Sequence, residues 1–282
     1  MSWFHETLYP DVRLGFNGRL LHRKKTAYQD LKIYKNHRFG KLMLLDNVIQ
    51  TTENDEFIYH EMLTHPVLFA HPNPKDVLVI GAGDGGILRE VLRHKVRHVD
   101  LVEIDTEVIR ASKKYLPSLS KGAFCDKRLS IILDDGARFV RDKSKEFDIV
   151  IVDSPDPVGP AKVLFGKKFY KDIFSILKNR GIMIRQAGSS MLQQDELKQN
   201  YKLLKKIFPS VTIGLAAIPT YIGGFFSFLI GAKGINFQGL SFRKIESRYK
   251  KLNLKTKYYN PQIHFASSKL PSYLRGIVNG KK

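Results

Sequence analysis

Five acidic side chains stand at or just beyond the ends of segments that have the character of buried strands. They are Asp84, Glu103, Asp135, Asp153 and Asp156. Because ligands of open α/β sheets bind beyond the carboxyl ends of the strands, we expect these carboxylates to converge on one rim. The chain has a formal net charge of +20, so a cluster of acids stands out against its surroundings. The pattern indicates a cationic ligand, or a proton that has to be removed at this rim.

A glycine-rich segment lies between the first strand-like segment and the helix predicted to follow it. The run GAGDGG at Gly81–Gly86 comes directly after Val77–Ile80. Glycines allow the backbone to turn tightly and to approach a ligand, and the start of a helix offers free amide groups. Glu103 follows about 20 residues later, where an acid can accept the hydroxyl hydrogens of a ribose. The combination predicts a site for a nucleoside cofactor.

Asp84, inside the glycine run, bears on the kind of cofactor. A carboxylate at this point repels a pyrophosphate, which counts against a dinucleotide such as NAD, whereas it suits a cation. An aspartate here can also cap the helix that begins at this point, and the two roles are compatible.

Strand-like and helix-like segments alternate from Asp76 onward. The strand-like segments are Val77–Ile80, Val99–Glu103, Leu129–Leu133, Ile149–Val152 and Ile182–Ile184, and the helical ones are Ile87–His94, Glu107–Tyr115, Gly136–Lys143 and Lys167–Lys178. Such alternation predicts a parallel sheet covered by helices on both faces. Two later segments, Val211–Ala217 and Phe226–Ala232, predict an antiparallel hairpin at the edge of the sheet. The expected fold is α/β, with a Rossmann-like domain of the class I methyltransferase type.

The first fifty residues read as a small β domain. We expect strands at Val12–Phe16, Leu20–Thr26, Tyr28–Tyr34 and Lys41–Leu45, with turns at Asn17-Gly18, Lys35-Asn36 and Asp46-Asn47. A helix capped by Thr51 or Thr52 is expected next, with the acids Glu53, Asp55 and Glu56 in its first turn, where the helix dipole favours them. These patterns predict an N-terminal β-strand domain over residues 1–54 and a catalytic domain over residues 55–282.

Composition narrows the protein class further. Hydrophobic residues make up 43% of the chain, yet no apolar run reaches the length of about 18 residues that a membrane span needs. The first residues do not have the pattern of a secretory signal, so a cytoplasmic location is expected. Cys125 is the only cysteine, which excludes intramolecular disulfides and cysteine-clustered metal sites. We expect neither a metal nor a membrane partner.

The positive charge is concentrated near the end of the chain. Residues 240–282 contain eleven Lys or Arg and one acid, Glu246. Interleaved aromatic side chains give this region a superficial likeness to an RNA-binding tail; they are Tyr249, Tyr258, Tyr259 and Phe265. The region also has spaced apolar residues and lacks a recognisable RNA-binding motif. We therefore expect a basic, solvated terminal segment with no specific nucleic-acid partner.

Seven motifs taken together resemble the polyamine aminopropyltransferase family, and the spermidine synthases in particular. They are GAGDGG at Gly81–Gly86, EID at Glu103–Asp105, DSPDPVGPA at Asp153–Ala161, IPTY at Ile218–Tyr221, YQD at Tyr28–Asp30, LDNVIQTTENDEFIYHEM at Leu45–Met62 and HPNP at His71–Pro74. The resemblance runs from about residue 3 to residue 270. It implies decarboxylated S-adenosylmethionine as donor, putrescine as usual acceptor, and spermidine and methylthioadenosine as products. It also implies no prosthetic group and a homodimer or homotetramer, with the N-terminal domain serving oligomerisation and part of the site.

The resemblance assigns roles to individual residues. Asp153 is the expected general base, and the acceptor-binding residues are Asp156, Tyr59, His60, Asp84 and Tyr221. The residues expected to hold the nucleoside are Gln29, Glu103, Asp135, Gly136 and Pro160. Without the resemblance, Tyr59, Tyr221 and His60 would be read as ordinary packing residues. Pro155 and Ile222-Gly223-Gly224 depart from the usual family pattern beside the acceptor pocket, and they leave the acceptor's identity open among putrescine, cadaverine and longer polyamines.

The implied reaction is a direct displacement at the carbon bonded to a sulfonium. A free alkyl amine has a pKa of about 10.4, so the acceptor arrives protonated, and Asp153 would take up its proton. The segment Ser154–Phe165, rich in Pro and Gly, is a candidate lid. Two alternatives remain: a methyltransferase that uses S-adenosylmethionine and acts on nucleic acid, for which the expected Asn/Asp-Pro-Pro-Tyr-like motif is missing, and a non-catalytic module that has kept the fold, against which the intact acids argue.

Overall fold

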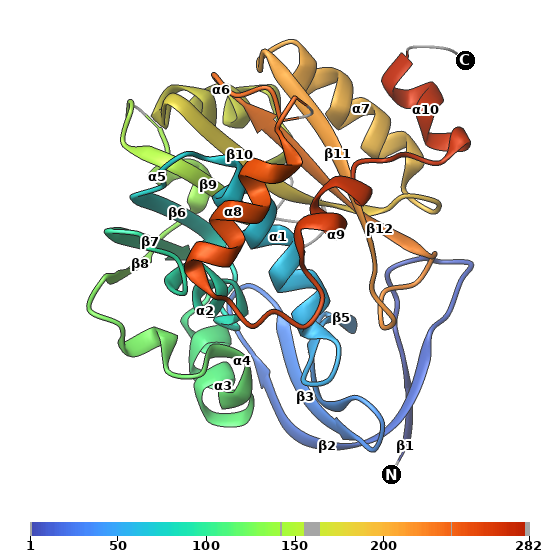
Figure 1. The fold of residues 1–282 in the computed structure, drawn as a ribbon. Coiled ribbons are helices and arrows are strands. Elements are labelled where there is room, and N and C mark those ends of the chain that lie inside the picture. The colour runs from blue at the N-terminus through green and yellow to red at the C-terminus, as the bar shows by residue number, and fades with distance from the viewer. Residues whose placement is uncertain (1, 142, 155–163, 238, 280–282) are drawn as a thin grey trace.

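The computed structural model describes residues 2–141, 143–154, 164–237 and 239–279, and within them the strands form two sheets. The smaller sheet contains β1 (Ser2–His5), β2 (Gly15–Lys25), β3 (Asp30–Asn36), β4 (Gly40–Leu45) and β5 (Val48–Thr52) in chain order. Its neighbouring strands are antiparallel. It lies beside the larger sheet, below it in the view of Figure 1.

Three predictions for the N-terminal residues are wrong. Lys35-Asn36 is not a turn but ends β3. Asn17-Gly18 is not a turn but lies inside β2, because a strand that the sequence pattern did not indicate, β1, pairs with it through Trp3 opposite Asn17. Thr51 and Thr52 do not cap a helix but end β5, another strand that was not predicted. The turn at Asp46-Asn47 is confirmed, and both residues have positive φ angles.

The larger sheet confirms the predicted Rossmann-like fold. Its order is β11-β12-β10-β9-β6-β7-β8, from the strands β6 (Asp76–Gly81), β7 (His98–Glu103), β8 (Leu129–Leu133), β9 (Phe147–Asp153), β10 (Leu177–Ser189), β11 (Ser210–Ala217) and β12 (Phe225–Ala232). Strands β10, β9, β6, β7 and β8 run parallel. The hairpin β11–β12 adds to β10 in antiparallel fashion and forms one edge, as predicted.

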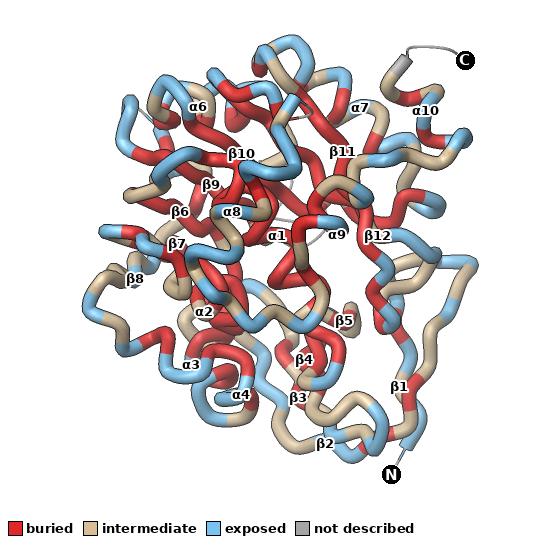
Figure 2. Tube along the Cα trace, viewed as in Figure 1, coloured by how far each residue is buried: buried red, intermediate tan, exposed pale blue. Residues whose placement is uncertain are grey.

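Helices cover both faces of this sheet. They are α1 (Glu56–Ala70), α2 (Gly86–Leu92), α3 (Thr106–Tyr115), α4 (Pro117–Ser120), α5 (Gly136–Phe139), α6 (Lys167–Ile176), α7 (Gln194–Lys205), α8 (Phe242–Leu252), α9 (Pro261–Ala266) and α10 (Ser272–Asn279), with a short 3₁₀ turn at Ala123–Cys125. One apolar core joins α1, α2 and α8 to the sheet, and a second joins α6, α7 and α10. Figure 2 shows that the buried residues are concentrated in the strands of the larger sheet and in α1. The smaller sheet packs on α3 and α4 through a third core.

Several helix boundaries differ from the predicted ones. Helix α1 begins after Asp55, so Glu56 is the acid of its first turn, and Asp55 instead accepts a hydrogen bond from Thr52. Helix α5 ends at Phe139, because the sequence after Val140 offers no apolar residue until Phe147 and cannot bury a continued helix. Helix α6 ends at Ile176, where β10 begins.

The basic C-terminal region is folded and is not the solvated segment that its charge indicated. Ile245 of α8, Tyr259 and Leu274 of α10 are fully buried. The Glu61 carboxylate of α1 accepts the backbone N–H groups of residues 257–259 at 2.7–2.8 Å. Arg248 donates to the carbonyls that end α1. The spaced apolar residues therefore outweigh the charge, because one face of the segment is apolar and packs on the rest of the protein. Among the described residues, no helix combines the length and apolarity that crossing a membrane requires.

Candidate active site

A cavity of about 510 Å³ lies at the carboxyl ends of β6, β7 and β9, where the small sheet and α1 meet the large sheet. Four of the five predicted rim acids line it: Asp84, Glu103, Asp135 and Asp153. Asp156 falls outside the described residues, as do Pro160 and most of the candidate lid. The remaining predicted site residues, Gln29, Tyr59, His60, Gly136 and Tyr221, also line the cavity.

Two glycines of the GAGDGG run are needed for this arrangement. Gly81 has a φ of +80°, and a Cβ atom there would lie 2.0 Å from the carbonyl oxygen of Asp153. A Cβ atom at Gly86 would lie 2.2 Å from the ring of His60. Glycine therefore lets β6 approach β9 and lets α2 begin directly against His60. Between them, Asp84 accepts the backbone N–H of Gly86 at 2.9 Å, so it also caps the start of α2.

Asp153 ends β9 and lies half-buried in the cavity wall, where the Tyr59 hydroxyl donates a hydrogen bond to its Oδ1 atom. Burial, reinforced by the negative charge of Asp84, raises the pKa of Asp153 to about 6, although the Tyr59 hydrogen bond acts in the opposite direction. Burial and the same carboxylates raise the pKa of the Tyr59 hydroxyl well above its usual value. Asp153 is therefore a stronger base than an ordinary aspartate and still ionised at neutral pH.

His60 lies between two carboxylates. Its Nδ1 atom is 2.5 Å from Oε2 of Glu56, one helical turn earlier in α1, and its Nε2 atom is 3.1 Å from Oδ2 of Asp84. Burial alone would lower the pKa of His60, but Asp84 and Glu56 outweigh it and raise that pKa to about 10. The pKa of Asp84 is lowered, since His60 and the Gly86 amide outweigh the effect of burial. His60 is thus a cation at neutral pH.

The end of β7 connects the two sheets. Glu103 accepts the backbone N–H of Asp105 at 2.9 Å, and burial raises the pKa of Glu103 to about 7. Asp105 caps α3 and accepts the side-chain amide of Gln29 at 2.9 Å. Gln29 therefore supports the Glu103 segment from the small sheet. Asp135 caps α5 by accepting the backbone N–H of Ala137 at 2.7 Å.

Aromatic rings form the wall beside Asp153. The rings of Tyr59 and Tyr221 are 5.7 Å apart in an edge-to-face arrangement, and Phe226 lies 5.7 Å from Tyr59. The Tyr221 hydroxyl donates to the carbonyl of Gln50 at 2.5 Å. Thr220, next to Tyr221, is held by Asp55 through both its amide and its hydroxyl. This wall is apolar along its length, with carboxylates at its end.

The sequence patterns did not indicate several of the residues that line the cavity. Glu6 is buried and accepts the backbone N–H of Ile49 at 3.0 Å. Gln186, Ser189 and Gln193 lie at and beyond the end of β10. The predicted strand ends at Ile184, whereas β10 continues to Ser189. A strand extended to this point would have placed these three polar residues at the same rim as the acids. Among the described residues, no group of three or more His, Cys, Asp or Glu side chains is arranged to hold a metal ion.

Comparison with known proteins agrees with this geometry. Residues 56–239 match the family model described as the spermine/spermidine synthase domain, and residues 2–53 match the spermidine synthase tetramerisation domain. The polyamine aminopropyltransferase of Pseudomonas syringae pv. tomato is 43% identical over 99% of this chain and 98% of its own length. That of Caldicellulosiruptor bescii is 45% identical over 98% of both chains.

Solved structures give the same result. A crystal structure of spermidine synthase in complex with the transition-state analogue AdoDATO superposes with a TM-score of 0.93 at 36% identity, covering 99% of this chain and 95% of the other. The spermidine synthase of Thermotoga maritima superposes with a TM-score of 0.92 at 36% identity, covering 99% and 94%. With sequence and structure matched over nearly its whole length, the chain belongs to the family of polyamine aminopropyltransferases, the spermidine and spermine synthases.

Proposed function

We propose that this aminopropyltransferase is a spermidine synthase, which transfers the aminopropyl group of decarboxylated S-adenosylmethionine to putrescine and releases spermidine and methylthioadenosine. The observation that carries the proposal is the half-buried carboxylate of Asp153 at the end of an aromatic wall, inside a cavity lined by further acids in a chain of charge +20. A diamine needs such a slot, because its methylene chain packs on rings while its amines need carboxylates.

The nucleoside half of the donor is assigned to the β7 side of the cavity. Glu103 accepts the ribose hydroxyl hydrogens, with Gln29 supporting its segment through Asp105. Asp135 and Gly136 follow the end of β8, and a Cβ atom at Gly136 would lie 2.4 Å from Ile80, so glycine lets the start of α5 pack directly against Ile80 in the cavity wall. We also assign Pro160 to the nucleoside site, on its place in the motif alone.

The acceptor is assigned to the β9 side. Tyr59 and Tyr221 flank the methylene chain, and Asp153 faces the reacting amine. Asp84, paired with His60, attracts the ammonium group of the aminopropyl chain. Asp156 is proposed as the second carboxylate on the acceptor amine, from its position three residues after Asp153.

The reaction follows from these positions. The lone pair of the acceptor nitrogen forms the new N–C bond while the C–S bond of the sulfonium breaks, and its electron pair stays on sulfur as a neutral thioether. The proton that the nitrogen must lose goes to Asp153. Burial helps here twice, since it raises the pKa of Asp153 to about 6 and lowers that of a desolvated ammonium. Alignment of nitrogen, carbon and sulfur supplies much of the remaining rate.

The identity of the acceptor is the most specific part of the proposal. Ile222 stands beside Tyr221 and lines the cavity, where the family pattern differs, so cadaverine and longer polyamines are the alternative acceptors. Residues 1–54 are proposed as the oligomerisation domain of a homodimer or homotetramer in the cytoplasm, on the match to a tetramerisation domain. Sedimentation of the full chain distinguishes the two assemblies.

Product analysis tests the proposal. Purified protein is incubated with decarboxylated S-adenosylmethionine and, in parallel, putrescine, cadaverine or spermidine, and the products are separated by mass spectrometry. Spermidine and methylthioadenosine in equal amounts from putrescine, with the highest kcat/KM of the panel, is the expected result. A higher kcat/KM for another acceptor would replace putrescine, and methyl transfer from S-adenosylmethionine with no aminopropyl transfer would overturn the proposal.

A further inference from the structure

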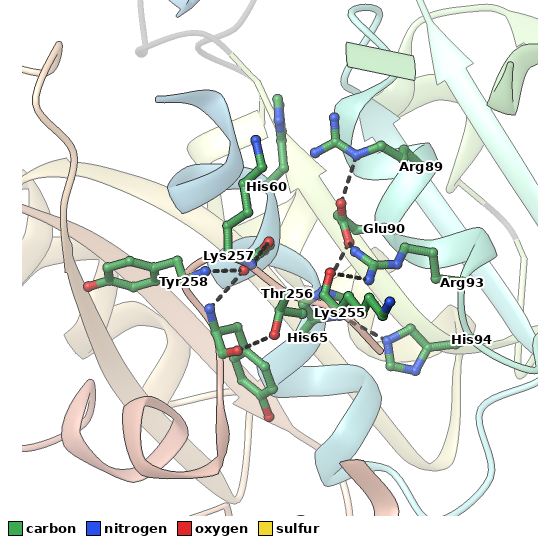
Figure 3. Close-up of polar contacts among 12 residues, drawn as sticks. His60, His65, Arg89, Glu90, Arg93, His94, Lys255, Thr256, Lys257 and Tyr258 are labelled. Carbon is green, nitrogen blue, oxygen red and sulfur yellow. Dashed lines mark hydrogen bonds and ion pairs between the residues drawn. The ribbon is translucent and has the colours of Figure 1, made fainter. Parts of the chain in front are cut away.

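A line of alternating charges leads from the cavity wall into the protein. Asp84 pairs with His60, His60 with Glu56, and Glu56 with Arg89, whose NH1 and NH2 groups lie 3.0 and 2.8 Å from the two carboxylate oxygens. Arg89 also pairs with Glu90 at 2.7 Å, and Glu90 with Arg93 at 2.5 Å. Figure 3 shows the contacts that join Arg89 to Glu90 and Glu90 to Arg93; His65 also contacts the Glu90 carboxylate.

The inner members of this line are shielded from water. Side chains of His60 and Glu90 are 2% exposed, and those of Glu56 and Asp84 are 7% exposed. Charges buried to this extent are stabilised by their partners, because solvent and salt screen them little. Removing one charge therefore changes the protonation of its neighbour.

The hydrogen-bonding capacity of the groups fixes the protonation of His60. Glu56 is ionised, since both its oxygens accept from the guanidinium of Arg89, so the facing Nδ1 atom of His60 has to carry a proton. The Nε2 atom faces the carboxylate of Asp84 and also has to donate. An imidazole that donates from both nitrogens is the imidazolium. Both oxygens of Asp84 are then held in place, because Oδ2 faces His60 and Oδ1 accepts a hydrogen bond from the backbone N–H of Gly86.

We propose that Glu56 is a positioning residue for aminopropyl transfer: held by Arg89, it keeps His60 doubly protonated, so that His60 fixes the orientation of Asp84 and balances its charge. The inference rests on the proposed role of Asp84 toward the aminopropyl ammonium. Glu56 itself does not line the cavity, so it acts through His60.

Charged and titratable groups face His60 from α1, α2, β9 and the loop between β6 and α2. Glu56 and Tyr59 face it from α1, Asp84 from the β6–α2 loop, Arg89 from α2 through Glu56, and Asp153 from β9 beyond Asp84. Glu56 and Asp84 are the anions in direct contact. Loss of one opposite charge at this range lowers a histidine pKa by roughly 1 to 3 units. Starting from about 10, His60 would then titrate inside the range in which the enzyme can be assayed.

The variant Glu56→Gln keeps the shape of the side chain and an oxygen for Arg89, but removes the negative charge. Arg89 stays anchored by Glu90 and by the carbonyl of Leu119. The matched control is Glu61→Gln, on the same helix and also buried, whose carboxylate binds backbone amides of residues 257–259 and does not contact His60. Both variants lose a buried carboxylate, so a purely structural effect appears in both.

Two readouts on the full-length protein test the inference. In ¹⁵N-histidine NMR, with His60 assigned from a His60→Gln variant, wild type and Glu61→Gln should show both ring nitrogens protonated up to pH 9. In Glu56→Gln the titration of His60 should move down by roughly 1 to 3 pH units. Because the charged form is the working one, kcat/KM of Glu56→Gln relative to wild type should fall roughly tenfold per pH unit above the new midpoint, whereas the ratio for Glu61→Gln stays flat.

An unchanged His60 titration in Glu56→Gln would overturn the inference. A lowered titration with a flat activity ratio would also overturn it, because the charge of His60 would then not contribute to the transfer. Failure of the proposed function itself is recognised separately, since the wild type would then form no aminopropylated product with any acceptor of the panel.

Discussion

Asp84→Asn is expected to weaken discrimination between decarboxylated S-adenosylmethionine and S-adenosylmethionine itself. The two molecules differ by one carboxylate beside the amine that we place near Asp84. With the decarboxylated donor, Asp84 meets an ammonium group, and with the full cofactor it also meets a negative charge. Rejection of the wrong molecule is then built from repulsion rather than from a better fit.

The size of this effect can be worked from the geometry. A cofactor carboxylate about 5 Å from Asp84 is repelled by about 3 kcal/mol at an effective dielectric constant of about 20. The His60 imidazolium, 3.1 Å behind Asp84, attracts the same carboxylate from about 8 Å and offsets about 2 kcal/mol of this. Asp84→Asn removes the repulsion but leaves this attraction, because His60 keeps its contact with Glu56, so the affinity ratio should change by about 3 kcal/mol, or roughly 10²-fold.

Isothermal titration of both ligands into wild type and variant is the assay, with melting curves to show that the variant is folded. The ratio of the two dissociation constants should shift by roughly 10²-fold in favour of S-adenosylmethionine, with weaker binding of the decarboxylated donor. An unchanged ratio would refute the reasoning. Selectivity would then arise elsewhere, and Asp84 would be left with its capping contact to Gly86.

Three further outcomes follow from the site. The kcat/KM profile should fall about tenfold per pH unit below a pKa of about 6, as Asp153 is protonated, and a limb near pH 4 would contradict the shift. Gly86→Ala should displace the His60 ring and cost roughly 10²-fold in kcat/KM, whereas Gly214→Ala, with ordinary space, should not. Asp153→Asn should stabilise the fold in urea by about 3 kcal/mol at pH 8 but hardly at pH 4, because the cost of the raised pKa accumulates between the ordinary value of 3.8 and about 6 and is complete above that range. Equal gains at both pH values would contradict it.

The parts of the fold that depend on chain-local patterns could be predicted from the sequence. Buried strands alternating with helices specify the parallel sheet, and strand ends specify the rim, so the four described acids of the cavity wall could be placed without coordinates. The N-terminal sheet could not be placed as well. Asn17-Gly18 has the composition of a hairpin turn, but the partner of its strand is β1, whose short segment has no clear alternation.

Other features depend on contacts between distant segments. Glu56 and His60 are one helical turn apart, a spacing visible in the sequence, but Arg89 joins them from another helix. Glu6 enters the cavity from an irregular N-terminal segment. The charge of the C-terminal region favours a solvated segment, whereas Ile245 and Tyr259 bury one face of it in the structure.

The most direct test of the account is the single-turnover rate of Asp153→Asn with decarboxylated S-adenosylmethionine and putrescine. Asparagine keeps the size of the side chain and an oxygen for the Tyr59 hydroxyl, but cannot accept the amine proton at neutral pH. The account predicts a rate at least about 10²-fold below wild type, with binding of methylthioadenosine unchanged. A rate within a few fold of wild type would contradict it, and Asp153 would not be the base.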